Sequence, residues 1–69
     1  MNEKLAERIK ELRIEQGYSI QSLSKELKIG ASSICRWENA KADISGSALI
    51  LLADFFNVST DYLLGRVDD

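Results

Sequence analysis

Catalytic side chains are scarce in this 69-residue sequence, which has no histidine and a single cysteine, Cys35. Histidine and cysteine build the common structural zinc sites, and histidine is the most frequent acid–base catalyst. The sequence also has no glycine-rich phosphate loop and no serine–lysine or carboxylate arrangement at a fixed spacing. We therefore expect a protein that is not an enzyme and that holds no metal or cofactor.

Side chains with binding chemistry gather in one short stretch of the chain. Ser32 and Ser33 can donate or accept hydrogen bonds, and Arg36 carries a planar guanidinium that can make two bonds to one base. Asn39 and Lys41 follow directly. These residue types contact phosphates and base edges in nucleic acids. The stretch therefore predicts a nucleic-acid contact; the competing interpretation is an ordinary solvated helix surface.

Two short helices are expected to position these side chains. The first is predicted over Ile20–Leu27, and the second runs from just after Gly30 to about Asn39. Ser19 and Gln21, at the start of the first, can direct side-chain and backbone N–H groups at a phosphate. Helices this short are not stable alone in water, so neighbouring segments must hold them. A helix pair held in this way with one face free is the arrangement that presents a helix to a DNA groove.

Three further helices are predicted, over residues 2–16, Gly46–Phe56 and Thr60–Leu64. At each helix start after the first, an apolar residue lies just before the capping residue. A second apolar residue lies five positions after that first apolar residue, which is the spacing of a hydrophobic staple. The four capping residues are Ser19, Gly30, Ser45 and Ser59. The residues expected in one core are Leu5, Ile9, Leu12, Leu23, Leu27, Ile34, Trp37, Leu49, Leu52, Ala53, Phe56 and Leu63. The sequence thus predicts one all-helical domain over 1–69, with an ordered core of about 2–65 and a frayed tail at 66–69.

Charge and hydropathy restrict the setting and the partners. The net charge is −2, whereas a nucleic-acid-binding domain is usually basic. The net negative charge comes from residues 46–69, which hold one base and four acids. The longest apolar run, Ala48–Ala53, is six residues, against about 20 for a membrane span. Because this run is too short to span a membrane, we expect no membrane partner. Since one cysteine cannot form an internal disulfide, we expect a cytoplasmic protein.

A known family has the same residues in the same order. They are Leu12-Arg13, Ser19 to Ser24, Ile34, Trp37-Glu38-Asn39 with Lys41, Leu52-Ala53, Val58-Ser59 and the closing Asp61-Tyr62-Leu63-Leu64-Gly65. This set resembles the Cro/CI-type helix-turn-helix family, also called XRE, of phage repressors, restriction-modification controllers and small bacterial regulators. The resemblance covers about residues 5–65. It implies a compact five-helix, lambda-repressor-like domain whose third helix enters the major groove.

The resemblance also assigns residue roles. It implies phosphate contacts at Asn39 and Lys41, and a partly buried ion pair between Arg13 and Glu38. Ala31 occupies a position where the family often has a long polar side chain that contacts DNA bases. Together with the side chains above, the DNA-binding candidates are Ser19, Gln21, Ala31, Ser32, Ser33, Arg36, Asn39 and Lys41.

Several positions depart from the family pattern. The family usually has glutamine at Ile20, glycine at Lys28 and Ala40, serine or threonine at Gly30, and proline at Ile44. Two interpretations follow. The first is a dimeric, sequence-specific transcription regulator, with repression the expected role and a double-stranded DNA operator as partner. The second is a protein-interaction, antitoxin or oligomerisation module on the same fold with weak or no DNA binding.

Apolar residues near the C-terminus exceed what one small core needs. They are Ile50, Leu51, Phe55, Tyr62 and Leu64. Helix-turn-helix modules bind DNA as symmetric pairs with half-sites one turn apart, about 34 Å. We expect part of this surplus to form a two-fold interface in a homodimer. The alternative is that the last helix covers the core with it.

Overall fold

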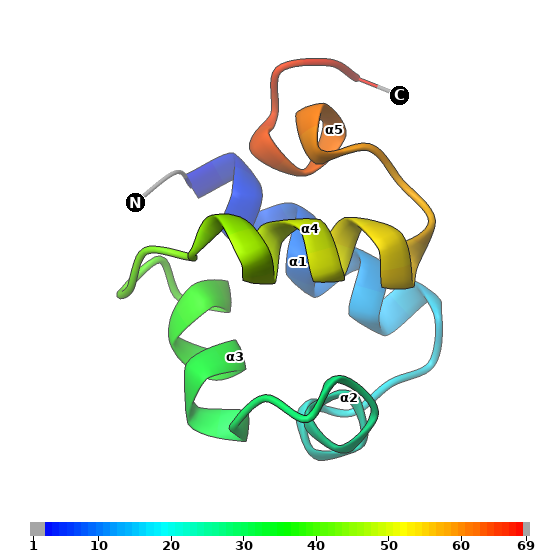
Figure 1. Ribbon diagram of the computed structural model, residues 1–69, viewed down its shortest axis with the longest axis vertical. Helices are drawn as coiled ribbons and strands as arrows, with labels where there is room; N and C mark the ends of the chain where they lie inside the picture. The colour runs from blue at the N-terminus through cyan, green and yellow to red at the C-terminus, as the bar shows by residue number, and fades with distance from the viewer. Residues whose placement is uncertain (1–2, 69) are drawn as a thin grey trace.

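The computed structural model describes residues 3–68, which form five helices and no strand (Figure 1). The helices are α1 (Glu3–Glu15), α2 (Ile20–Leu27), α3 (Ala31–Glu38), α4 (Gly46–Phe56) and α5 (Thr60–Leu64). The predicted all-α, five-helix class is confirmed, and the predicted bounds of α2, α4 and α5 coincide with the observed ones. Residue 2, the predicted start of α1, lies outside the described residues.

Serine caps begin three of the helices. The Ser19 hydroxyl accepts a hydrogen bond from the Ser22 amide at 3.0 Å, and the Ser22 hydroxyl accepts one from the Ser19 amide at 2.9 Å. Ser45 and Ser59 accept from amides three residues later, at 3.2 and 3.0 Å. Gly30 caps α3 without a side-chain bond. These caps satisfy amides that would otherwise lack partners, which is why the helices start where the sequence predicts.

Among residues 3–68, three residues other than glycine adopt left-handed backbone conformations. They are Lys28 with φ 58°, Ala40 with φ 56° and Asn57 with φ 59°. Lys28 ends α2 and Asn57 ends α4, whereas Ala40 follows α3. Lys28 and Ala40 lie at positions where the family usually has glycine. A residue with a Cβ atom is strained in the left-handed region, whereas glycine is not. The turn between α2 and α3 and the segment just after α3 therefore both carry local strain.

All five helices contribute to one core. Eleven of the predicted core residues are buried there; Leu49 is the exception, because it is half-buried and packs against the edge of the cluster. Ala6 is buried in addition. Ile9, Leu23, Ile34, Leu52 and Leu63 are fully buried. In Figure 1, α4 crosses the front of the molecule with α1 behind it, while α2 and α3 lie below and α5 above. The core therefore holds the α2–α3 pair at one end of the molecule.

Arg8 is a buried charge that the sequence did not predict. Its side chain lies on the Tyr62 ring, with the guanidinium carbon 4.1 Å from the ring centroid. Its Nη1 atom donates to the carbonyl oxygens of Tyr62 and Val67, the latter at 2.6 Å. Nη2 lies 3.7 Å from the Asp68 carboxylate. Val67 and Asp68, in the tail 66–69 that was expected to be frayed, are therefore tied to α1, while Asp69 lies outside the described residues.

Candidate nucleic-acid interface

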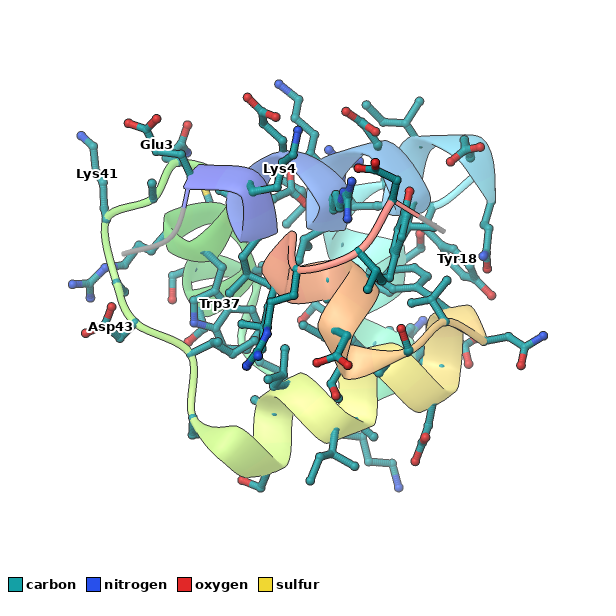
Figure 2. The ribbon with its side chains drawn as sticks, turned by 90° about the horizontal axis from the view of Figure 1, so that it is seen from above. Glu3, Lys4, Tyr18, Trp37, Lys41 and Asp43 are labelled. Carbon is teal, nitrogen blue, oxygen red and sulfur yellow. The ribbon has the colours of Figure 1, made fainter. Side chains whose placement is uncertain are left out.

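One face of α3 points away from the core. Ser32, Cys35, Arg36 and Asn39 are exposed, at i, i+3, i+4 and i+7 spacing, so they form a single stripe. Ile34 and Trp37 lie on the opposite face and are buried; Figure 2 shows Trp37 turned into the molecule. We call these four exposed residues the α3 stripe. It places Arg36 in the middle of a surface free to meet a partner.

The first turn of α3 offers little chemistry. Ala31 and Ser33 are half-buried, and Ser32 alone in this turn is exposed. A serine hydroxyl makes one donor bond and discriminates weakly between bases, whereas arginine can hold the O6 and N7 atoms of guanine together. Arg36 is thus the only side chain of the α3 stripe that can make a bidentate contact with guanine.

The Asn39 side chain is committed to its own helix. Its Nδ2 atom donates to the Cys35 carbonyl oxygen at 2.8 Å and lies 3.4 Å from Cys35 Sγ. The amide therefore helps to close the C-terminus of α3. Because the amide nitrogen carries two N–H groups, a phosphate contact through Asn39, as the resemblance implies, can replace the Cys35 Sγ contact and leave the bond to the Cys35 carbonyl oxygen in place. Lys41 is exposed two residues later and projects from the edge of the molecule in Figure 2.

A second polar surface lies along α2. Ser19, Gln21, Ser22, Ser24 and Lys25 line a shallow concavity of about 540 Å³. Gln21 and Lys25 are exposed there. The Ser19 hydroxyl is occupied by the capping box, so it is less free to bind a phosphate than its position suggests. Lys25 is not among the predicted site residues. Its position four residues after Gln21 puts its positive charge on the same face of the helix, and this spacing could have indicated a phosphate contact.

Ile20 explains one departure from the family pattern. It is half-buried and packs against the core. At the position where the family usually has glutamine, this chain therefore has an apolar contact instead of a polar side chain. Any phosphate contact at the start of α2 must come from neighbouring groups such as Gln21.

An ion pair joins α1 to the end of α3. Arg13 Nε donates to Glu38 Oε2 at 2.7 Å and Arg13 Nη2 donates to Glu38 Oε1 at 3.0 Å. Nη1 donates to the Tyr18 carbonyl oxygen at 2.9 Å. The two side chains are 12% and 5% exposed. The hydrogen bond to Glu38 raises the pKa of Arg13, and the Glu38 charge adds to this against the effect of burial. The pair that the resemblance implies is present, and it fixes α3 relative to α1.

Comparison with known proteins places these features in a family. A family model described as helix-turn-helix matches residues 9–63. The chain is 37% identical over 62 residues to the HTH-type transcriptional regulator ImmR of Bacillus subtilis (strain 168), in an alignment that covers 90% of this chain and 49% of that protein. The chain thus spans about half the length of this relative. Within residues 3–68, no helix is long and apolar enough to cross a membrane. The chain belongs to the Cro/CI-type, or XRE, family of helix-turn-helix proteins.

Proposed function

We propose that this chain is a sequence-specific DNA-binding transcription regulator, a repressor of phage or bacterial type that acts in the cytoplasm. It forms a single helix-turn-helix domain over residues 1–69, reads the major groove with α3, and binds a double-stranded operator as a homodimer. The observation that carries this proposal is the α3 stripe, with Arg36 exposed at its centre and the helix fixed by the Arg13–Glu38 pair.

Each exposed polar residue takes a distinct role in this proposal. Arg36 makes a bidentate contact with guanine, and Ser32 adds a weak contact at the groove edge. Lys41 after α3 and Lys25 on α2 bind phosphates on either side of the reading helix and set its register. Gln21 supports the contact at the start of α2.

A protein-interaction module on the same fold is the second candidate. The net charge of −2 and the packing of Ile20 against the core both favour it. The negative net charge weakens the electrostatic attraction to phosphates that nonspecific DNA binding requires, and Ile20 removes a polar side chain that could contact a phosphate. The two candidates differ in one measurable property, the dependence of duplex binding on salt.

Titration with a random-sequence duplex at rising salt tests the proposal. We expect measurable binding at low salt, with an affinity that falls steeply as salt is added, because phosphate contacts release counterions. Lys41→Ala and Lys25→Ala should each reduce the slope of log K against log salt by about 0.9. Arg66→Ala, in the segment beyond α5 at the other end of the molecule from α2 and α3, is the matched control and should leave the slope unchanged (Figure 1). Absence of binding at low salt would favour the interaction module.

A further inference from the structure

The turn between α2 and α3 holds a lysine in a conformation that suits glycine better. Lys28 has φ 58° and ψ 38°, in the left-handed region, where a residue with a Cβ atom is strained and glycine is not. Its backbone N–H donates to the Ser24 carbonyl oxygen, so this conformation is part of the cap that ends α2. Strained residues cluster at sites that bind a ligand. The turn itself would form more easily with glycine, so a reason for the lysine must lie in its side chain.

The Lys28 side chain is exposed and continues a line of polar residues along α2. Gln21, Lys25 and Lys28 are exposed at i, i+4 and i+7 spacing, so they follow one side of the helix. We call these three residues the α2 stripe. The Ser24 hydroxyl, three residues after Gln21, donates to the Ile29 carbonyl oxygen. This side of α2 therefore borders the turn that leads into α3.

The α2 stripe belongs to the positive part of a negative protein. Residues 19–41 hold four bases and two acids, whereas the whole chain has a net charge of −2. One of these acids, Glu38, is paired with Arg13. Among the described residues, neither Lys25 nor Lys28 forms an ion pair with a carboxylate. Both ammonium groups are therefore available to an anionic partner.

We propose that Lys28 is a DNA phosphate contact that extends the α2 stripe to the start of α3, and that the strain at this residue is the cost of placing it there. The inference rests on the proposed function, in which α3 lies in the major groove. In Figure 1, the turn from α2 joins the lower end of α3, and Lys41 follows the opposite end of that helix in sequence. An ammonium group on a long stem holds a phosphate without reading sequence.

The contact compensates for what the start of α2 lacks. Ile20 is half-buried against the core, and the Ser19 hydroxyl is bonded within the capping box. Gln21 remains there as a neutral donor, while the end of α2 has the two charges of Lys25 and Lys28. A charged contact releases a counterion from the duplex, so it adds to the salt dependence of binding. Phosphate binding thus moves from the first turn of α2 to its last turn and cap.

Salt titration of a short random-sequence duplex, followed by fluorescence anisotropy, tests the charge of Lys28. Lys28→Gln should weaken binding at low salt about two- to fivefold and reduce the slope of log K against log salt by about 0.9. Lys28→Arg keeps the charge and should keep the slope. Arg66→Gln is the matched control, because it removes an exposed base beyond α5, at the other end of the molecule (Figure 1). An unchanged slope for Lys28→Gln, or an equal reduction for Arg66→Gln, would overturn the proposal.

Lys28→Gly tests whether the strain serves binding. Relief of the strain should raise the melting temperature, while loss of the charge should weaken duplex binding as Lys28→Gln does. Asn57→Gly is the control, because it places glycine at the left-handed end of α4 and should leave the affinity and the salt slope unchanged. Lys28→Gly that binds as tightly as wild type, or that loses stability together with affinity, would overturn the proposal.

The same measurements separate this inference from the proposed function. Wild type that binds the duplex and selects a guanine through Arg36, with the same salt slope for Lys28→Gln, overturns the Lys28 contact alone. A salt slope that depends on Lys28, in a protein that enriches no sequence from a random pool, overturns sequence-specific reading and leaves the contact in place. Absence of duplex binding at low salt overturns both.

Discussion

Arg13 and Glu38 show how two residues fix the orientation of α3. Two parallel hydrogen bonds, at 2.7 and 3.0 Å, join α1 to the last residue of α3. The third bond of Arg13, to the Tyr18 carbonyl oxygen at 2.9 Å, also holds the loop between α1 and α2. The guanidinium thus joins α1 to both the end of α3 and the loop that leads into α2. Its role is structural, and its effect on binding passes through the position of α3.

Glu38→Ala should destabilise the domain by about 3–5 kcal/mol, because it leaves the mostly buried Arg13 without its charged partner. The double variant Arg13→Met with Glu38→Leu should recover much of this loss, since an apolar pair carries no unpaired charge. Urea unfolding measures both. If Glu38→Ala alone unfolds at the wild-type urea concentration, the pair does not hold α3.

The pKa of Arg13 limits what pH can do to this pair. The hydrogen bond to Glu38 raises the pKa of Arg13 above its ordinary, already strongly basic, value. A group whose pKa is raised by folding contributes stability below its unfolded pKa and loses it as pH rises through the folded one. For Arg13 that loss lies in strongly alkaline solution, because its raised pKa starts from an already strongly basic value. The arginine side of the pair therefore gives no pH dependence of stability in the neutral range.

At the scale of elements, the helix ends decide how the α2–turn–α3 unit is built. The chain leaves α2 at Lys28 and passes Ala40 after α3, both with left-handed backbone. Such a conformation costs a residue with a Cβ atom about 1–2 kcal/mol relative to the right-handed one. The family's usual glycine avoids this cost. This chain keeps the turn in spite of it because α2 and α3 are held by the core on both sides.

Lys28→Gly and Ala40→Gly should each stabilise the domain by about 0.5–1 kcal/mol, the relief of strain being partly offset by the extra freedom of glycine in the unfolded chain. The melting temperature should rise by about 2–8 °C in a domain of this size. Asn57→Gly is the control and should change stability less, since asparagine already tolerates this conformation. Calorimetry that finds either glycine variant less stable would show that the strain argument is wrong.

The sequence predicts these elements well because their signals are local. Serine caps and apolar staples lie within six residues of each helix start, and all four predicted caps are in place. Arg8 was missed because its partners, Tyr62 and Val67, lie 54 and 59 positions away in the sequence. The phosphate contact of Asn39 stays a prediction; the structure adds that its amide also caps α3, a local bond that the sequence alone does not distinguish from a ligand contact.

At the scale of the whole molecule, a single small core carries the stability. The cluster of buried residues draws on all five helices, and α1 and α5 complete it from opposite ends of the chain. The sequence predicts every residue of this cluster, but it also places Leu49 there, which is only half-buried. The apolar face of α4 is wide, so the sequence does not show which of its edges faces the core. A domain this small has little stability to lose.

Leu52→Ala should cost about 2–5 kcal/mol, since Leu52 is fully buried and truncation leaves a cavity. Leu51→Ala, the neighbouring residue on the exposed side of α4, should stay within about 0.5 kcal/mol of wild type. Thermal unfolding of the two variants compares them directly. Equal melting temperatures for Leu52→Ala and wild type would show that α4 does not face the core as described.

The central claim, that α3 reads DNA through Arg36, is tested most directly by selection from a random DNA pool with wild type, Arg36→Ala and Lys41→Ala. We expect wild type to enrich sites with a preferred guanine in each half-site. Arg36→Ala should bind these sites about 1–3 kcal/mol more weakly and lose preference at that one base pair. Lys41→Ala should weaken all sequences alike and keep the preference. If Arg36→Ala selects the same sites with the same preference, or if wild type enriches no sequence, the claim is contradicted.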